Sequence, residues 1–265
     1  NSDGAGEVTA VGPGVTAWAV GDRVTSCFFA DWQAGECSPE AMTSALGGAR
    51  QGVLAEEVVL PAGGVIAMPE DLSFEEAACL PCAALTAWHA LTQPRPVVAG
   101  ETVLLLGTGG VSVFAQQFCQ VMGARTIVTS SSDEKLTRMR ALGAAGTVNY
   151  RSDPDWDKDV LDMTDGRGVD VVFEHVGKAT FPASVFLAAK YGRIVICGAT
   201  TGYNLNFDVR HLWMRQKQII GSHFADADSA GRANRLMIQG KVKPVMTRLF
   251  TWDEIADAHQ LMYEN

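Results

Sequence analysis

The longest uninterrupted apolar run near the middle of the chain is followed at once by a glycine turn. Residues 102–106 read TVLLL, and GTGGVS at 107–112 leads into residues with helical spacing of apolar side chains, which stop at Gly123. A strand without polar alternation is covered on both faces, as in a parallel sheet. The pattern therefore predicts a buried strand, a tight turn and a helix.

Further strand-like runs recur after this helix at regular distances. With 102–106 they make six, at 126–130, 146–150, 169–174, 193–198 and 218–222. The segments between them are predicted to be helical from Asp133, Asp155 and Phe181, and to end near Gly143, Gly166 and Gly192. Alternating strands and helices predict an α/β fold with a doubly wound parallel sheet, whose ligand lies beyond the carboxyl ends of the strands.

The segments on either side of this sheet have a different pattern. Residues 1–83 contain short strand-like runs, GDRVTSCFF and GVLAEEVVLP among them, and predict a β-rich domain. Residues 84–222 form the predicted dinucleotide-binding domain. Residues 223–265 are predicted to form a helix, a short strand near 247–250 and a helix from Trp252, and to return to the first domain.

Composition narrows the function classes. The 265 residues are 47% hydrophobic and 19% charged, with a net charge of −9 and no basic run. This argues against nucleic acid or an anionic membrane as partner and favours a small-molecule substrate. There is no membrane-spanning apolar stretch or signal peptide, and the six scattered cysteines suggest reduced thiols, so we expect a cytoplasmic protein.

The glycine turn has the pattern of a dinucleotide-binding fingerprint with one change. Gly107 suits a tight turn and Gly109 a close approach of the backbone to a diphosphate, while Ser112 replaces the third glycine and is expected to loosen helix packing slightly. The predicted contacts are Thr108, Gly109, Gly110 and Val111, through free amides and the helix dipole. By spacing alone, an ordinary strand-to-helix turn fits as well.

The end of the second strand indicates which nicotinamide cofactor is used. Ser130 lies 23 positions after Gly107, where an acidic residue would bind the ribose hydroxyls of NAD. Ser130, Ser131 and Lys135 would instead accept a 2′-phosphate, so NADP(H) is favoured over NAD(H). Ser132 or Asp133 is also expected to cap the next helix, which does not conflict with cofactor binding, and a solvated surface lysine is an equally good interpretation of Lys135.

Several motifs together resemble those of one protein family. They are AGEVTAVGPGV with GDRV, GVLAEEVVLP, AACLPCAALTAWHAL, GTGGVS, DEKLTRMRALGA with VNYR, and GRIVICGATTG. Across essentially the whole chain they resemble the medium-chain dehydrogenase/reductases. The resemblance implies a GroES-like catalytic domain that is incomplete at its N-terminus, followed by a Rossmann domain, with hydride transfer as the activity.

The resemblance also bears on zinc. Asn1, Ser2 and Asp3 stand where the zinc enzymes carry Gly-His-Glu, so the imidazole ligand is missing. Cys82 aligns with a second zinc cysteine, although a small packing residue is the simpler interpretation. Cys27 and Cys37 are too few for the structural zinc lobe. We therefore predict that the protein binds no metal.

Other cofactor contacts follow from position in the family. The resemblance assigns them to one helix position and to the carboxyl ends of strands: Thr86, Tyr150, Val176, Gly198, Ala199, Thr200, Ser222, His223 and Phe224. For Val176 and Ala199, simple packing is an equally good account.

Among the five histidines, His223 is the candidate catalytic residue because it follows the last strand of the sheet. A hydrogen-bonded histidine between domains is the alternative. His175 is expected to contact the cofactor. The remaining three, His89, His211 and His259, fall in predicted helices and are expected to be structural. The aromatic residues Phe28, Phe29 and Trp32 are candidates for the substrate pocket, or else core residues.

Without zinc, an acceptor already activated by conjugation suits hydride transfer best, such as an enoyl thioester, an enone or a quinone. Residues 208–236 resemble crotonyl-CoA carboxylase/reductases and favour enoyl thioesters, whereas GGARQGVLAEEVV departs from the carboxylating enzymes. A zinc-free alcohol or aldehyde dehydrogenase and a noncatalytic nucleotide-binding relative are the alternatives. The resemblance also implies a homodimer through the edge strand near QIIGSHF.

Overall fold

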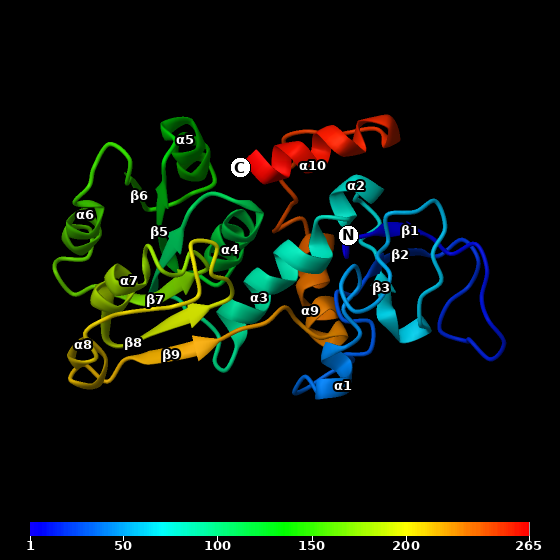
Figure 1. Cartoon of the computed structure of the whole chain (residues 1–265), viewed down its shortest axis with the longest axis horizontal. Helices are drawn as coiled ribbons and strands as arrows, with labels where there is room; N and C mark the ends of the chain where they lie inside the picture. The colour runs from blue at the N-terminus through cyan, green and yellow to red at the C-terminus, as the bar shows by residue number, and fades with distance from the viewer. Residues whose placement is uncertain (265) are drawn as a thin grey trace.

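The computed structural model describes residues 1–264 and contains two separate sheets (Figure 1). The larger is a six-stranded parallel sheet with strand order β6-β5-β4-β7-β8-β9. Its strands are β4 (Thr102–Leu106), β5 (Arg125–Ser130), β6 (Gly146–Asn149), β7 (Val169–Glu174), β8 (Ala188–Ile196) and β9 (Gln218–Gly221). The predicted doubly wound sheet is therefore confirmed.

Helices cover both faces of this sheet because β4 and β7 are apolar on both sides. All five residues of β4 are buried, with Leu105 facing α4 and Leu104 facing α7. The helices that follow the strands are α4 (Gly110–Val121), α5 (Asp133–Ala141), α6 (Trp156–Asp162) and α7 (Phe181–Leu187). Two hydrophobic cores result, one on each face.

The first part of the chain forms a three-stranded antiparallel sheet. It consists of β1 (Ala5–Glu7), β2 (Arg23–Ser26) and β3 (Val65–Ala67), with β2 in the centre. The predicted strand in GVLAEEVVLP is wrong, because residues 52–61 form no strand and the Val59 side chain is fully exposed. The short helices of this region are α1 (Pro39–Met42), η1 (Ala62–Gly64), α2 (Phe74–Ala77) and the π-helix η2 (Leu80–Ala84).

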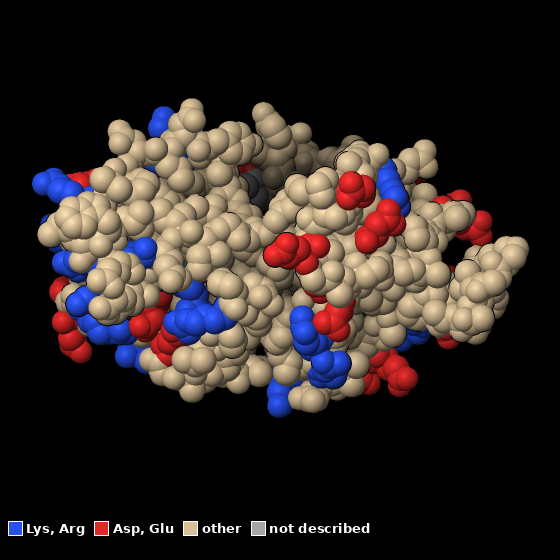
Figure 2. Space-filling model, turned by 90° about the horizontal axis from the view of Figure 1, so that it is seen from below, with Lys and Arg blue, Asp and Glu red and all other residues tan. Residues whose placement is uncertain are grey.

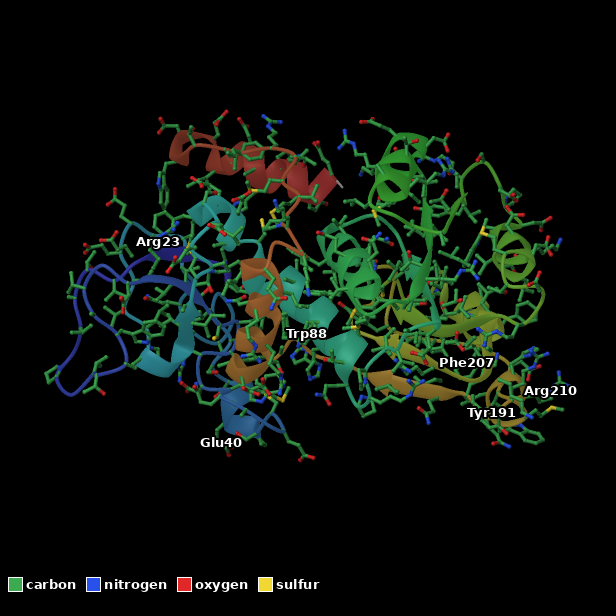
Figure 3. The ribbon with its side chains drawn as sticks, turned by 180° about the vertical axis from the view of Figure 1, so that it is seen from behind. Arg23, Glu40, Trp88, Tyr191, Phe207 and Arg210 are labelled. Carbon is green, nitrogen blue, oxygen red and sulfur yellow. The ribbon has the colours of Figure 1, made fainter. Side chains whose placement is uncertain are left out.

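Two helices lie between the sheets: α3 (Leu85–Thr92) and α9 (Ala227–Ile238) (Figure 1). Trp88 on α3, near the centre of Figure 3, packs edge-on against Phe118 of α4 at 5.3 Å between ring centroids. On α9, the Asn234 Nδ2 donates to the carbonyl oxygen of Ala67 in β3 (3.1 Å). The two sheets are therefore joined through a common helical layer.

Two further details differ from the sequence-based expectations. The helix predicted from Phe181 ends at Leu187, and β8 begins at once with the buried Ala188 and Ala189. The β7–β8 pairing is irregular at this point, because residues 189–192 of β8 lie between the pairs Val169–Ala188 and Val171–Arg193, so Gly192 lies inside a strand and ends no helix. No strand forms at 247–250, and the chain continues through η3 (Trp252–Glu254) to α10 (Ile255–Glu264). The remaining short helix, α8 (Arg210–Trp213), lies between β8 and β9 in the sequence.

The charges on the face seen in Figure 2 are of both signs and are interspersed with uncharged side chains. All six cysteines are free thiols. Within residues 1–264, no helix is both long enough and apolar enough to cross a bilayer.

Candidate active site

The turn between β4 and α4 leaves backbone amides free at a helix start. Gly107 has a φ of +86°, and the extended Gly109 is the N-cap of α4. Gly109 and Gly110 are exposed, and a Cβ added to Gly109 would meet nothing within 4 Å. The first amides of a helix have no intrahelical acceptor and lie at its positive end. This arrangement fits the diphosphate of a dinucleotide.

Ser112, at the third fingerprint position, is completely buried between α4 and the sheet. Its hydroxyl donates to the carbonyl oxygen of Leu106 (3.3 Å) and lies 3.1 Å from Nε2 of His175. Burial lowers the pKa of His175. We expected Ser112 only to loosen the packing of the helix, but its hydroxyl connects the end of β4 with the residue that follows β7.

The turn after β7 is organised by Glu174, a residue that we did not predict. Its fully buried carboxylate accepts hydrogen bonds from the amides of Val176 (2.8 Å) and Gly177 (2.9 Å). The hydroxyls of Thr180 (3.0 Å) and Ser184 (2.5 Å) also donate to it. The sequence signal was an acidic residue at the end of an otherwise apolar strand.

The loops after β7 and β8 pack directly against each other. The Thr200 amide donates to the carbonyl oxygen of His175 (3.3 Å), and a Cβ on Gly177 would lie 2.9 Å from the Cα of Ala199. A Cβ on Gly198 would lie 3.1 Å from the carbonyl oxygen of His175. The predicted contacts at 176 and 198–200 are thus brought together at the carboxyl end of the sheet.

The predicted 2′-phosphate residues lie at the end of β5. The Ser130 side chain is buried, and its hydroxyl lies 3.2 Å from the Thr108 hydroxyl. Ser131 is half-buried and Lys135 is exposed. The Tyr150 amide donates to the carbonyl oxygen of Ser130 (3.1 Å). Ser131 and Lys135 are therefore the accessible members of this group.

Ser132 caps α5 by accepting a hydrogen bond from the Lys135 amide (3.3 Å), so the capping interpretation is confirmed.

The segment after β9 packs against residues 28–32, a loop after β2 that carries Phe28, Phe29 and Trp32. The His223 ring lies 5.3 Å from that of Phe29 and 4.8 Å from that of Phe224, and Phe224 stacks on Phe28 at 3.5 Å. We call residues 222–226 together with 28–32 the seam. Phe29 is only 3% exposed and Trp32 only 5%, so both are core side chains, whereas Phe28 and Phe224 are half-buried. His223 is exposed, and partial desolvation lowers its pKa.

His89 also lies at the seam, although we had expected it to be only structural. Its Nδ1 is 2.9 Å from the Ser222 hydroxyl, and its ring lies 6.0 Å from that of Trp32. Burial lowers the pKa of His89, with a further decrease from His223 and an opposing increase from Asp226. No local pattern could have revealed a contact between residues 133 positions apart.

The other two histidines are elsewhere. His211 lies on α8 with its ring 5.7 Å from that of Phe186, and His259 lies on the exposed helix α10.

Cys82 lies in the π-helix η2, where burial and the charge of Asp3 raise the pKa of its thiol to about 12. Thr86, which is buried, forms a hydrogen bond with this cysteine. Burial also raises the pKa of Asp3, which accepts a hydrogen bond from the Ser2 hydroxyl (2.7 Å). The polar groups at this end of the site are therefore the protonated Cys82 thiol and the Asp3 carboxyl group.

Two family models match the chain. The one described as an alcohol dehydrogenase GroES-like domain matches residues 1–70, and the one described as a zinc-binding dehydrogenase matches residues 110–239. The chain is 40% identical to a zinc-type alcohol dehydrogenase-like protein of Schizosaccharomyces pombe over 269 residues, which cover 99% of the chain and 78% of the relative. The chain belongs to the medium-chain dehydrogenase/reductase family. It is an oxidoreductase with a nicotinamide cofactor.

Other members of the medium-chain dehydrogenase/reductase family that resemble the chain act on acyl-CoA by name. A crotonyl-CoA carboxylase/reductase of Cereibacter sphaeroides is 36% identical, with all of the chain and 69% of the relative covered. The solved structure of a 2-octenoyl-CoA carboxylase reductase in complex with NADP and 2-octenoyl-CoA is 32% identical and superposes with a TM-score of 0.88. That alignment covers 99% of the chain and 65% of the other protein.

One of the two matching family models is described as a zinc-binding dehydrogenase, so the side chains that could hold a zinc ion were compared with the requirements of such a site. A catalytic zinc takes three protein ligands and needs its cysteines as thiolates. In residues 1–264, no three His, Cys, Asp or Glu side chains are grouped as metal ligands. The donor set around Cys82 and Asp3 therefore does not fit a catalytic zinc.

Proposed function

We propose that this protein is a zinc-independent, NADPH-dependent reductase that transfers hydride to an activated C=C bond or a quinone, with an enoyl thioester as the first candidate. The observation that carries this proposal is the donor set at Cys82, which offers a thiol and the Asp3 carboxylate but, within residues 1–264, no third metal-ligating side chain. In a zinc-dependent alcohol dehydrogenase, the metal is the Lewis acid that stabilises the alkoxide. A conjugated acceptor needs none, and two of the relatives described above are named for enoyl-CoA reduction.

The residues of the site have distinct roles in this proposal. The amides that begin α4 bind the diphosphate. The bound cofactor supplies the hydride. The packed loops at Val176 and Ala199 form the wall on which the nicotinamide lies, and Glu174 fixes that wall. Exposed His223 and the half-buried rings of Phe28 and Phe224 face the acceptor.

Preference for NADPH over NADH is supported by the end of β5. Ser131 and Lys135 are accessible there, and no carboxylate occupies 130–132 to repel a 2′-phosphate. We expect the Kd for NADPH to be lower than that for NADH, and Lys135→Met to raise only the former. Arg138→Met on the same helix is a matched control, because Arg138 pairs with Glu134. Equal Kd values for the two cofactors in a fluorescence titration would contradict this assignment.

The experiment that tests the function is NADPH oxidation with four acceptors: crotonyl-CoA, an enone, a quinone and a simple aldehyde. Each is measured with and without a chelator, and the zinc content is determined. We expect turnover with at least one conjugated acceptor, no effect of the chelator and no bound zinc. One zinc per chain, or activity with the aldehyde alone, would overturn the proposal. NADPH binding without any turnover would indicate a noncatalytic relative.

We also propose that the protein is a cytoplasmic homodimer. Free cysteines suit a reducing compartment. β9 is an edge strand with exposed residues, and Ile219 is 38% exposed on it. An exposed edge can pair with a second copy and so continue the sheet.

A further inference from the structure

One hydrogen bond joins the helical layer to the acceptor side of the site. His89 lies on α3, and its Nδ1 is 2.9 Å from the hydroxyl of Ser222, the residue that follows β9. The Ser222 amide donates to the carbonyl oxygen of Ile196 in β8 (2.8 Å). The backbone of Ser222 is thus held by the sheet and its side chain by α3.

The other end of the same segment is held by α9 and by the loop that follows β2. Asp226 is buried and accepts a hydrogen bond from the Ser229 amide as the N-cap of α9. The next amide, that of Ala227, donates to the carbonyl oxygen of Trp32 (3.0 Å). Between these anchors, Phe224 has a φ of +50°. A bulky residue rarely adopts this left-handed conformation, so it persists only while its surroundings enforce it.

His223 lies between the two anchors and is free to bind another group. Its ring contacts the rings of Phe29 and Phe224. Within residues 1–264, neither of its ring nitrogens has a hydrogen-bond partner in the protein. Its direction is therefore set by the backbone of 222–224 and by the ring contacts.

We propose that His89 is a positioning residue for the acceptor, because its hydrogen bond to Ser222 fixes the direction in which His223 faces the substrate. This inference rests on the proposed function. His89 itself touches neither the cofactor nor the acceptor. Losing its bond removes an anchor from a segment whose backbone at Phe224 is unfavourable, and the segment then relaxes.

Two substitutions of His89 test this role, because the amide group of each replaces a different nitrogen of the ring. In His89→Asn, the amide group lies about where Nδ1 lies, so the bond to Ser222 can be kept. In His89→Gln, the amide lies nearer the position of Nε2, and that bond is lost. We expect His89→Gln to lower kcat/KM for the active acceptor about tenfold, as for the loss of one hydrogen bond, and His89→Asn to retain most of it.

Three measurements distinguish positioning from general stability. The Kd for NADPH should change by less than about twofold in both variants, since the bond does not lie at the phosphate turn. Ser222→Ala should reproduce the loss, and the double variant should be no worse than the more affected single variant. His211→Gln on α8 is the control histidine and should leave kcat/KM unchanged.

The contradicting results are equally specific. Equal activity of the Asn and Gln variants, or fully additive effects of His89→Gln and Ser222→Ala, would overturn the positioning role of His89. A loss confined to NADPH binding would do the same. If His89→Gln fails to fold, Ser222→Ala and His89→Asn decide the question. A wild-type protein without turnover of any acceptor would overturn the proposed function, and the positioning role with it.

Discussion

The hydroxyl of Ser112 and the Nε2 of His175 lie 3.1 Å apart, so the phosphate turn is joined to the end of β7. A glycine at position 112 would remove this contact from the buried ring. Ser112 also bonds to Leu106, which places three elements around one buried hydroxyl. The departure from the glycine fingerprint is therefore a local structural link.

Replacing Ser112 should reduce stability more than cofactor affinity. We expect Ser112→Ala to lower the free energy of unfolding by about 1–3 kcal/mol, because buried His175 loses a hydrogen-bond partner. Ser112→Gly should cost about 0.5–1 kcal/mol more, since glycine is unfavourable within a helix. Urea unfolding and NADPH titration measure the two effects. A stability equal to wild type in Ser112→Gly would show that the link contributes nothing.

Gly177 should tolerate a side chain less well than Gly166. Both have positive φ, +87° and +76°, but a Cβ on Gly177 would lie 2.7 Å from the carbonyl oxygen of Gly202, whereas one on Gly166 meets open space. Gly166→Ala should cost about 1–2 kcal/mol from backbone strain alone. Gly177→Ala should cost more and also weaken NADPH binding. Equal losses in urea unfolding would contradict the importance of this close approach.

Stability should fall as the pH drops below about 6.5. Burial lowers the pKa of His175 below its unfolded value of 6.5, so the unfolded state binds more protons between these two values. The contribution of neutral His175 is complete above pH 6.5 and is lost as the pH falls through its folded pKa.

The difference between wild type and His175→Gln isolates this histidine, because His89 and His223 have lowered pKa values as well. Urea unfolding from pH 7.5 to 5 should show a shallower pH dependence in the variant. Parallel curves would indicate that His175 does not titrate in this range.

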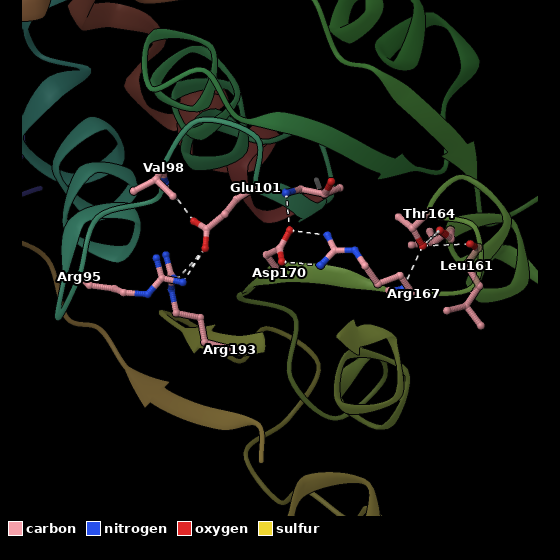
Figure 4. Close-up of polar contacts among 11 residues, drawn as sticks. Arg95, Val98, Glu101, Leu161, Thr164, Arg167, Asp170 and Arg193 are labelled. Carbon is pink, nitrogen blue, oxygen red and sulfur yellow. Dashed lines mark hydrogen bonds and ion pairs between the residues drawn. The ribbon is translucent and has the colours of Figure 1, made fainter. Parts of the chain in front are cut away.

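Glu101, which directly precedes β4, forms a charged cluster with Arg95 and with Arg193 of β8 (Figure 4), and loss of the carboxylate should affect stability differently from loss of Arg193. Glu101 is 2.5 Å from Arg95 and 3.6 Å from the buried Arg193. No guanidinium nitrogen of Arg193 has a hydrogen bond within the described residues. Removing the carboxylate in Glu101→Gln leaves buried Arg193 without its ion-pair partner and should cost about 3 kcal/mol or more.

Arg193→Met removes the buried charge itself and should leave stability unchanged or higher by about 1 kcal/mol or more. Lys190→Met on the same strand is exposed and serves as the control. A strongly destabilised Arg193→Met in urea unfolding would show that the buried ion pair is a net stabilising contact.

A charge on the edge strand should separate the proposed dimer. Ile219→Lys places an ammonium on β9, where a second copy would pair, and a charged edge opposes such pairing. We expect the variant to elute as a monomer in size-exclusion chromatography with light scattering, with unfolding unchanged. Leu249→Lys, at an exposed position outside any strand, is the control. A monomeric wild type would refute the dimer directly.

The large sheet could be predicted because its signals are local. The strand at 102–106, the turn and α4 are contiguous, and the strand and helix patterns follow one another at regular distances. Prediction failed where a partner decides the structure. The run GVLAEEVVLP has strand propensity but no pairing strand in residues 1–264, and 188–190 are compatible with both helix and strand until β7 selects the strand.

In the candidate site as well, the positions set by local pattern could be predicted and the nonlocal contacts could not. Positions at the carboxyl ends of strands follow from the topology, and the structure brings the loops at residues 175–177 and 198–201 together there. The contact between His89 and Ser222 is nonlocal, so periodicity carries no information about it. Burial of Phe29 and Trp32 depends on packing against the segment after β9, which the local sequence does not specify.

The chain passes between its two sheets through α3 and again through residues 222–226, and the bond from His89 to Ser222 joins these two passages. Because both passages share this bond, a shift of α3 relative to the large sheet would also shift the backbone that carries His223. The arrangement of the two halves of the molecule and the geometry beside the acceptor are therefore coupled.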